Sequence, residues 1–441
     1  MQFKIRIHPQ EFWISKTMNL FWRCCRLPLG ALMLAWVGPM VAVGLAGDWP
    51  QILGPHRDGK ADNETLLDRW PASGPRSLWT YDLGEGYAGP AVVGNRVVVF
   101  HRLQKKERLE AIDLNTGRSV WQIDFAARYG GGINSDTGPR CVPLIHDGTV
   151  YAFGAAGDLH AVELATGKER WSREAYIDFG GDFGYFGAGS TPLVAGNNVL
   201  VNVGGRRSGA GIVAFSTATG KTVWKATNDD ASYSSPSLTI INGKPTAIFV
   251  TRLNCVGIDA ESGTVRFSFP FGARGPTVNA ATPLIFDDHL FLSASYGVGA
   301  VYAKFNGNGE EKVWSNDESM SSQYSTCVYS NGYLYGTHGR EDVGAAELRC
   351  IEAKTGKVQW SEPNFGVGNP ILAGDKLLIL NIEGHLVLAA ANPNKYQPLA
   401  KATVARATTR SLPALSQGRF LFRTNGDSSK LICLAVGGMA E

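Results

Sequence analysis

The sequence predicts an all-β protein, an eight-bladed β-propeller built from four-stranded antiparallel blades. Three observations lead to this fold class. A short motif containing proline recurs along the chain, an aromatic residue follows a Thr-Gly turn at a fixed distance, and no long segment beyond residue 70 has helical periodicity. Repeats of about 40 to 50 residues with about four strands each have the size of propeller blades.

The N-terminal residues 1–47 are predicted to form a signal peptide or a membrane anchor. Arg23 and Arg26 precede the uncharged run 27–47, which ends in small residues like those of a cleavage site. The same run is long enough to span a bilayer uncleaved. In both cases the basic residues before the run place the bulk of the chain outside the cytoplasm.

We therefore expect an exported protein that is either periplasmic or anchored in the inner membrane, with translation starting at Met1 or Met18. Membrane contact is expected only through residues 27–47. The rest of the chain divides into an extended lead-in segment, residues 48–76, and the propeller, residues 77–438.

The first repeated signal marks the start of each blade. A proline, replaced once by cysteine, recurs at intervals of 43 to 53 residues. Proline suits the beginning of a strand, where its missing N–H removes no bond from the sheet. The eight positions are Pro90, Pro143, Pro192, Pro236, Pro283, Cys327, Pro370 and Pro413.

The second signal, A-x-D-x-x-T-G-x-x-x-W, begins about 20 residues beyond the first. Its glycine supplies a positive φ in a hairpin turn, and its aromatic residue opens the next strand, where it can pack on a neighbouring sheet. The turn glycines are Gly117, Gly167, Gly220, Gly263 and Gly356. The aromatic residues are Trp79, Trp121, Trp171, Trp224, Phe267, Trp314 and Trp360. We expect all of them to have structural roles.

The ends of the repeat array predict how the ring closes. The last unit, residues 411–436, has only three strands, and Trp79 precedes any complete unit. An N-terminal strand at Trp79 would therefore complete the last blade and remove the exposed edges of an open array.

The repeated pattern resembles the tryptophan-docking repeat of the pyrroloquinoline quinone (PQQ) propellers, and the chain is identified as a member of the PQQ-binding-like β-propeller repeat family. The resemblance covers nearly all of residues 79–436, and segment 48–59 with Trp70-Pro71 is similar to the lead-in of exported bacterial members. It implies one of two functions. Some relatives are quinoprotein dehydrogenases that hold PQQ and calcium on the propeller axis; others, such as the outer-membrane assembly lipoprotein, are non-catalytic scaffolds. The fold alone does not choose between them.

Residues just before each blade start are predicted to lie near the axis, where they would bind a polar or anionic ligand. No carboxylate is among them, which counts against the calcium–PQQ site that the resemblance implies for dehydrogenases. The alternative is that they only bond the channel backbone and water. These residues are Tyr87, Arg140, Tyr233, Asn279, Tyr324, Asn369 and Arg410.

Two long loops, residues 129–139 and 176–189, are rich in glycine and aromatic residues, and we expect a lid or partner surface, or else ordinary blade connections. Asp178, Asp182 and the aromatic residues of the second loop would form such a surface.

Composition excludes other partners. The net charge is +3 without a basic stripe, so no nucleic acid is expected. The histidines are dispersed and no metal motif occurs, so we predict no metal site. The cysteines of the propeller, which stand singly, are predicted to be buried small hydrophobic residues.

Taken together, we predict an exported, non-catalytic, monomeric propeller that acts as a scaffold, with a protein partner or small ligand at one face and no cofactor. The alternative is a divergent PQQ-dependent alcohol or sugar dehydrogenase with calcium.

Overall fold

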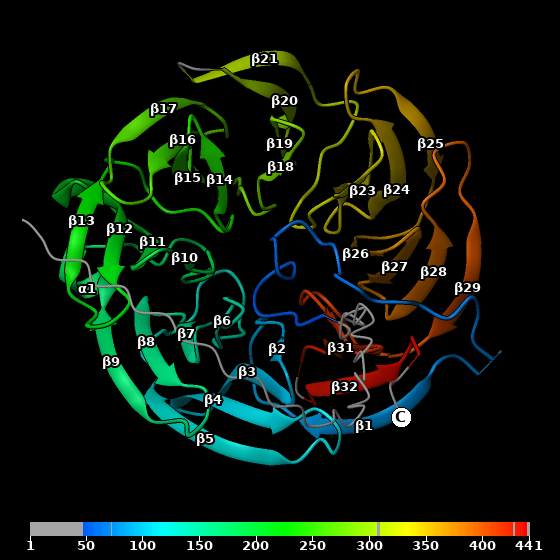
Figure 1. Ribbon diagram of the computed structural model, residues 1–441, viewed down its shortest axis with the longest axis horizontal. Coiled ribbons are helices and arrows are strands. Elements are labelled where there is room, and N and C mark those ends of the chain that lie inside the picture. Colours follow the sequence, from blue (N-terminus) through cyan, green and yellow to red (C-terminus); the bar gives the residue numbers. More distant parts are fainter. Residues whose placement is uncertain (1–46, 72, 307–308, 427, 439–441) are drawn as a thin grey trace, which may run out of the picture. The chain divides into compact units, whose positions relative to one another are not determined.

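The computed structural model describes residues 47–71, 73–306, 309–426 and 428–438. They contain eight four-stranded antiparallel sheets arranged as the blades of a propeller around a central axis (Figure 1). The fold class predicted from the sequence is confirmed. The predicted signal or anchor lies outside the described residues, except for Gly47.

The strands of each blade follow one another from the axis outwards. Blade 1 contains β2 (Ala91–Val93), β3 (Arg96–Leu103), β4 (Lys106–Asp113) and β5 (Ser119–Ala126); blade 2 contains β6 (Leu144–His146), β7 (Thr149–Phe153), β8 (Asp158–Glu163) and β9 (Glu169–Glu174). Blade 3 contains β10 (Leu193–Ala195), β11 (Asn198–Gly205), β12 (Ala210–Ser216) and β13 (Thr222–Ala226); blade 4 contains β14 (Ser237–Ile241), β15 (Lys244–Val250), β16 (Asn254–Asp259) and β17 (Val265–Pro270). Blade 5 contains β18 (Leu284–Phe286), β19 (His289–Ala294), β20 (Gly299–Asn306) and β21 (Gly309–Asn316); blade 6 contains β22 (Val328–Ser330), β23 (Tyr333–Arg340), β24 (Ala345–Glu352) and β25 (Val358–Glu362). Blade 7 contains β26 (Gly368–Ala373), β27 (Lys376–Asn381), β28 (His385–Ala390) and β29 (Pro398–Thr403).

Blade 8 joins the two ends of the propeller, as predicted. Its inner strands β30 (Ala414–Ser416), β31 (Arg419–Arg423) and β32 (Lys430–Ala435) come from the C-terminal end, and its outermost strand is β1 (Arg76–Asp82). β1 pairs antiparallel with β32, with Trp79 opposite Cys433. Outside the strands, the described chain has a short helix α1 (Ala175–Phe179) and one 3₁₀ turn (Arg206–Ser208).

The repeated prolines stand where the chain reaches the axis. Seven of the eight blade-start positions lie immediately before the innermost strand; Pro370 instead lies inside β26, which begins two residues earlier. The first strand of most blades has only three to six residues, so the chain turns back quickly.

The A-x-D-x-x-T-G pattern forms the turn between the third and fourth strands. In blade 1, the Asp113 carboxylate accepts the N–H groups of Asn115 and Thr116 at 3.1 and 2.9 Å, and the N–H of Gly117 bonds to the Asp113 carbonyl at 2.9 Å. Gly117 has a φ of 68°, which favours glycine. The pairing of β4 with β5 shifts register next to this turn, between Ala111 and Ile112.

Each repeat aromatic residue then packs on the turn of the following blade. The rings of Trp79, Trp121, Trp171 and Trp224 lie directly over the glycine of that turn. The indole N–H groups of the first three donate at 2.8 to 2.9 Å to main-chain oxygens of the same turns. Trp314 and Trp360 make the equivalent bonds to Ala353 and Asn392. The contact therefore survives in blade 7, although its turn lacks the Thr-Gly pair.

The hydrophobic core lies between successive blades. Phe100 and Leu109 of blade 1, for example, share one cluster with Val150 and Ala152 of blade 2, and all four are fully buried. The cysteines behave as predicted: those at 141, 255, 327, 350 and 433 are buried and unpaired.

The two ends of the axis differ. At one end, here called the loop face, long connections run from each blade to the next. At the other, the lead-in face, the lead-in segment lies over the innermost strands (blue, near the centre of Figure 1). It forms bridges from Trp49 to Val92, from Lys60 to Leu372 and from Leu66 to Gly437, and so reaches blades 1, 7 and 8.

Across the described ranges, no helix has the length and apolar character needed to cross a membrane.

Candidate functional site

Six of the seven predicted axial residues belong to the connections at the loop face, and Asn369 lies at the start of β26; they form separate groups and not one ring. Arg140 and Tyr87 lie together, as do Tyr324 and Arg410. The other three do not join a group. Tyr233 and Asn279 bond to the main chain, and Asn369 is buried.

The group of Tyr324 and Arg410 is centred on the carboxylate of Glu341, which was not among the residues predicted from the sequence. The Nε of Arg410 lies 3.0 Å from both oxygens of Glu341, and the hydroxyl of Tyr324 donates to the same carboxylate at 2.9 Å. Burial would lower the pKa of Arg410, but the bonds to Glu341 outweigh it and raise that pKa. Burial, followed by the charge of Glu341, raises the pKa of Tyr324. The group therefore joins one guanidinium and one tyrosine hydroxyl on a single carboxylate.

The group of Tyr87 and Arg140 is centred on the Arg140 guanidinium. This guanidinium lies over the rings of Tyr87 and Tyr129, at 5.5 and 5.3 Å from their centroids. The two terminal nitrogens donate to the main-chain oxygens of Gly138 and Asp136, and the Asp136 carboxylate is 3.6 Å away. Such cation–π contacts contribute more when the cation is withdrawn from water, and here the Arg140 side chain is only 9% exposed.

Of the remaining three residues, Tyr233 and Asn279 bond to the backbone. The Tyr233 hydroxyl accepts the N–H groups of Tyr185 and Phe186 at 2.8 and 2.9 Å. The amide of Asn279 donates to three main-chain oxygens, the shortest bond being 3.0 Å to Thr251. The side-chain oxygen of Asn369 is buried without a partner in the described chain.

The two long loops lie side by side on the loop face. The N–H of Ile133 donates to the carbonyl of Tyr185 at 3.1 Å, and the rings of Tyr129 and Phe183 are 5.7 Å apart. This framework holds Ile133, Ile177 and Phe183 outwards, with exposed fractions of 72%, 64% and 44%. We call these three residues the loop patch.

Two carboxylates lie beside the axial residues, although none is among the seven residues predicted from the sequence. Glu341 stands in the turn between β23 and β24, and Asp136 in the loop before Arg140. Neither is next to a repeat proline, so the motif could not identify them. The one signal in the sequence is the charged run Arg340-Glu341-Asp342, which has no counterpart in the same turn of most other blades.

These donors do not fit a calcium–PQQ site. Calcium is held by six to eight oxygen ligands, several of them carboxylates. Each axial carboxylate here already faces an arginine. Within the part of the chain that the structure describes, no three His, Cys, Asp or Glu side chains converge in a manner that could hold a metal ion.

Comparison with known proteins agrees with the repeat pattern. The family model of the outer membrane protein assembly factor BamB matches residues 64–182 and 105–362. A relative with that description from Burkholderia pseudomallei (strain K96243) is 22% identical over 375 residues, which cover 74% of this chain and 91% of the relative.

Two further likenesses point to both kinds of PQQ-repeat protein. The dehydrogenase subunit of the quinone alcohol dehydrogenase of Gluconobacter oxydans (strain 621H) is 31% identical over 162 residues, 33% of this chain and 20% of that protein. The crystal structure of BamB from Moraxella catarrhalis has a TM-score of 0.60 at 15% identity, covering 81% of this chain and 97% of that one. At such identity the structural likeness shows the fold alone.

Proposed function

The chain belongs to the family of the outer membrane protein assembly factor BamB, and from that premise we propose that it is an exported, non-catalytic scaffold of the cell envelope. It binds a protein partner at its loop face and functions as a monomer without a cofactor. Residues 1–47 serve as its signal or anchor, 48–76 as the lead-in and 77–438 as the propeller.

The observation that carries the proposal is the loop patch. Ile133, Ile177 and Phe183 are large apolar side chains that a lone propeller would expose to water. Exposed apolar groups gathered on a rigid scaffold are typical of interaction sites. Removing this area from water on binding would supply about 25 cal/mol per Å².

The surroundings of the patch support a preformed surface. Tyr233 holds the second loop through two N–H groups, and the Tyr185 hydroxyl donates to Gly275 at 3.3 Å. A loop held in this way loses little conformational entropy when a partner binds. Arg140, which is paired and stacked below the loops, acts as a support and not as a catalytic group.

A second candidate is a divergent PQQ-dependent alcohol or sugar dehydrogenase. The local match to the Gluconobacter oxydans subunit favours it, but that match spans a third of this chain. The donor set at the axis does not support it, because Glu341 and Asp136 already face arginines.

Site-specific photo-crosslinking tests the scaffold proposal. A benzophenone amino acid at Phe183 or Ile133 of the full chain, expressed in its native envelope, should give a discrete protein adduct. The matched control is Val223 on β13, an apolar residue that is 50% exposed on an outermost strand. Equal adducts from Val223 and Phe183, or none from either loop position, would contradict the proposal.

A further inference from the structure

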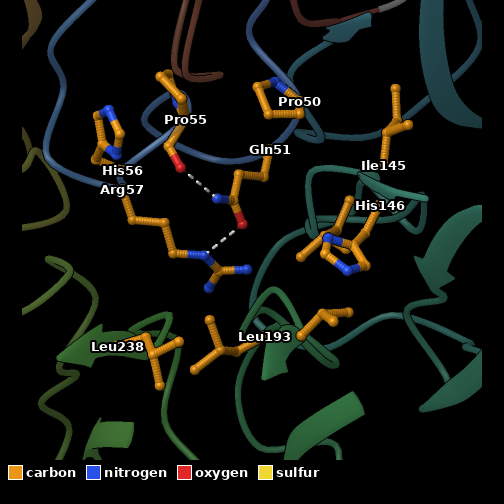
Figure 2. A pocket seen from close by; sticks show the side chains of 11 residues that line it. Pro50, Gln51, Pro55, His56, Arg57, Ile145, His146, Leu193 and Leu238 are labelled. Carbon is orange, nitrogen blue, oxygen red and sulfur yellow. Dashed lines mark hydrogen bonds between the residues drawn. The ribbon is translucent and has the colours of Figure 1, made fainter. Parts of the chain in front are cut away.

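The lead-in face contains a cavity of about 400 Å³ that the proposed scaffold function does not use. It lies between the lead-in segment and the innermost strands of blades 2, 3 and 4 (Figure 2). Its lining is polar and apolar in about equal parts, and the apolar part includes Leu144, Ile145, Leu193 and Leu238. We call it the lead-in cavity. Cavities of this size and character are typical of small-molecule sites.

The charged side chain of Arg57 lines the same cavity as these apolar residues. It is only 2% exposed, and Figure 2 shows its guanidinium pointing between the lead-in segment and Leu193. Its Nε donates to the side-chain oxygen of Gln51 at 2.7 Å, and Nη1 to the Pro236 carbonyl at 2.8 Å. Nη2 donates to the Pro192 carbonyl. All three acceptors are uncharged.

A buried cation without an anion is unfavourable, because neutral carbonyls replace only part of its hydration. No carboxylate of the described chain forms an ion pair with Arg57, whereas the axial arginines of the loop face each have one. Burial lowers the pKa of Arg57 to about 9, which still leaves it charged at neutral pH. Two of its five N–H groups also remain without a bond to the described chain, since each Nη carries two hydrogens and donates one.

The missing anion and the apolar walls define a ligand. A carboxylate matches the planar fork of a guanidinium and would accept the two remaining N–H groups. An apolar body would cover the leucine side chains that line the cavity. A doubly charged phosphate would cost more to withdraw from water than one cation could offset.

We propose that the lead-in cavity binds a small monocarboxylate with an apolar body, with the carboxylate on Arg57 and the body against Leu144, Leu193 and Leu238. The site is independent of the loop patch, which is on the opposite face.

Isothermal titration of the full chain with 3-phenylpropionate tests the proposal. The matched probes are 3-phenylpropanol and 3-phenylpropylamine, which keep the apolar body and replace the anion by a neutral or cationic group. We expect one site per chain and binding of the acid at least tenfold tighter than that of either probe. Equal affinities for acid and alcohol, or no binding of the acid at millimolar concentration, would overturn it.

Cavity-filling variants locate the site without disturbing Arg57. Leu238→Trp, at a position 41% exposed on the cavity wall, should weaken binding of the acid at least tenfold. Ile240→Trp is the control, since Ile240 is 64% exposed on the same strand and does not line the cavity. Unchanged affinity in Leu238→Trp, or equal losses in both variants, would refute the location. Arg57→Gln should also abolish the preference for acid over alcohol, provided that it melts cooperatively.

Discussion

The indole N–H of Trp79 donates a 2.8 Å hydrogen bond to the main-chain oxygen of Leu114, and this bond joins the last blade to the first. Trp79 lies on β1, the N-terminal strand of blade 8, whereas Leu114 follows the third strand of blade 1. The ring is therefore closed by two independent contacts, the pairing of β1 with β32 and the packing of Trp79 on the next blade.

Trp79→Ala should lower the free energy of unfolding by about 3 kcal/mol, because it removes a large packed ring and its hydrogen bond. Deletion of residues 76–83 should destabilise the whole propeller further, since β32 would lose its outer partner strand and keep only β31. Chemical denaturation followed by circular dichroism measures both effects. An unchanged cooperative transition after the deletion would refute closure through β1.

The contact between Trp79 and Gly117 can be isolated by a glycine control. A Cβ on Gly117 would lie 2.7 Å from the Trp79 ring, whereas a Cβ on Gly148, with the same φ of 68°, meets no atom within 4 Å. Gly148→Ala should cost about 1 kcal/mol for backbone strain alone, and Gly117→Ala about 1 to 3 kcal/mol more. In a Trp79→Ala background, which removes the ring but keeps the Cβ at 3.0 Å, most of this excess should disappear. If it persists, the ring does not occupy this position.

Glu107 predicts a pH dependence of stability. It is 1% exposed, and burial raises its pKa from 4.5 to about 7, although the N–H of Ala155 donates to it at 2.9 Å. Because the pKa of Glu107 is raised in the folded state, its contribution to the free energy of unfolding is complete below pH 4.5. This contribution is lost as the pH rises to about 7. Wild type should therefore lose about 3 kcal/mol relative to Glu107→Gln across this range. Denaturation at pH 4.5 and pH 8 checks this, and a constant difference between the two proteins would contradict it.

The ion pair of Arg410 with Glu341 should contribute more to the free energy of unfolding than the adjacent pair of Arg340 with Asp342. Glu341→Gln removes the anion from a partly buried guanidinium and should cost about 1 to 3 kcal/mol. Asp342→Asn breaks the adjacent pair with Arg340, in which the aspartate is 54% exposed, and should cost less than about 1 kcal/mol. Urea denaturation compares the two variants, and equal losses would contradict the stronger contribution of the Arg410–Glu341 pair.

The repeats made most of the fold predictable. A proline at the start of seven innermost strands and a glycine in the outer turn of five blades are local requirements of the backbone, so they are visible in the sequence. Trp79 was predictable as the missing strand because the repeat array was one strand short.

The sites were less predictable, because their partners are distant in sequence. Arg57 bonds to the carbonyls of Pro192 and Pro236, and backbone acceptors leave no signature in the side chains. Glu341 lies 69 residues from Arg410 and in a different kind of loop. The partner of Arg410 stands in the turn between β23 and β24, a part of the blade that the blade-start motif does not describe.

Reconstitution of the purified chain with PQQ and calcium tests the scaffold account most directly. The account predicts no stoichiometric binding of PQQ and no dye-linked oxidation of alcohols or sugars above a protein-free control. Binding of one PQQ per chain with calcium-dependent oxidation of any alcohol or sugar would contradict it.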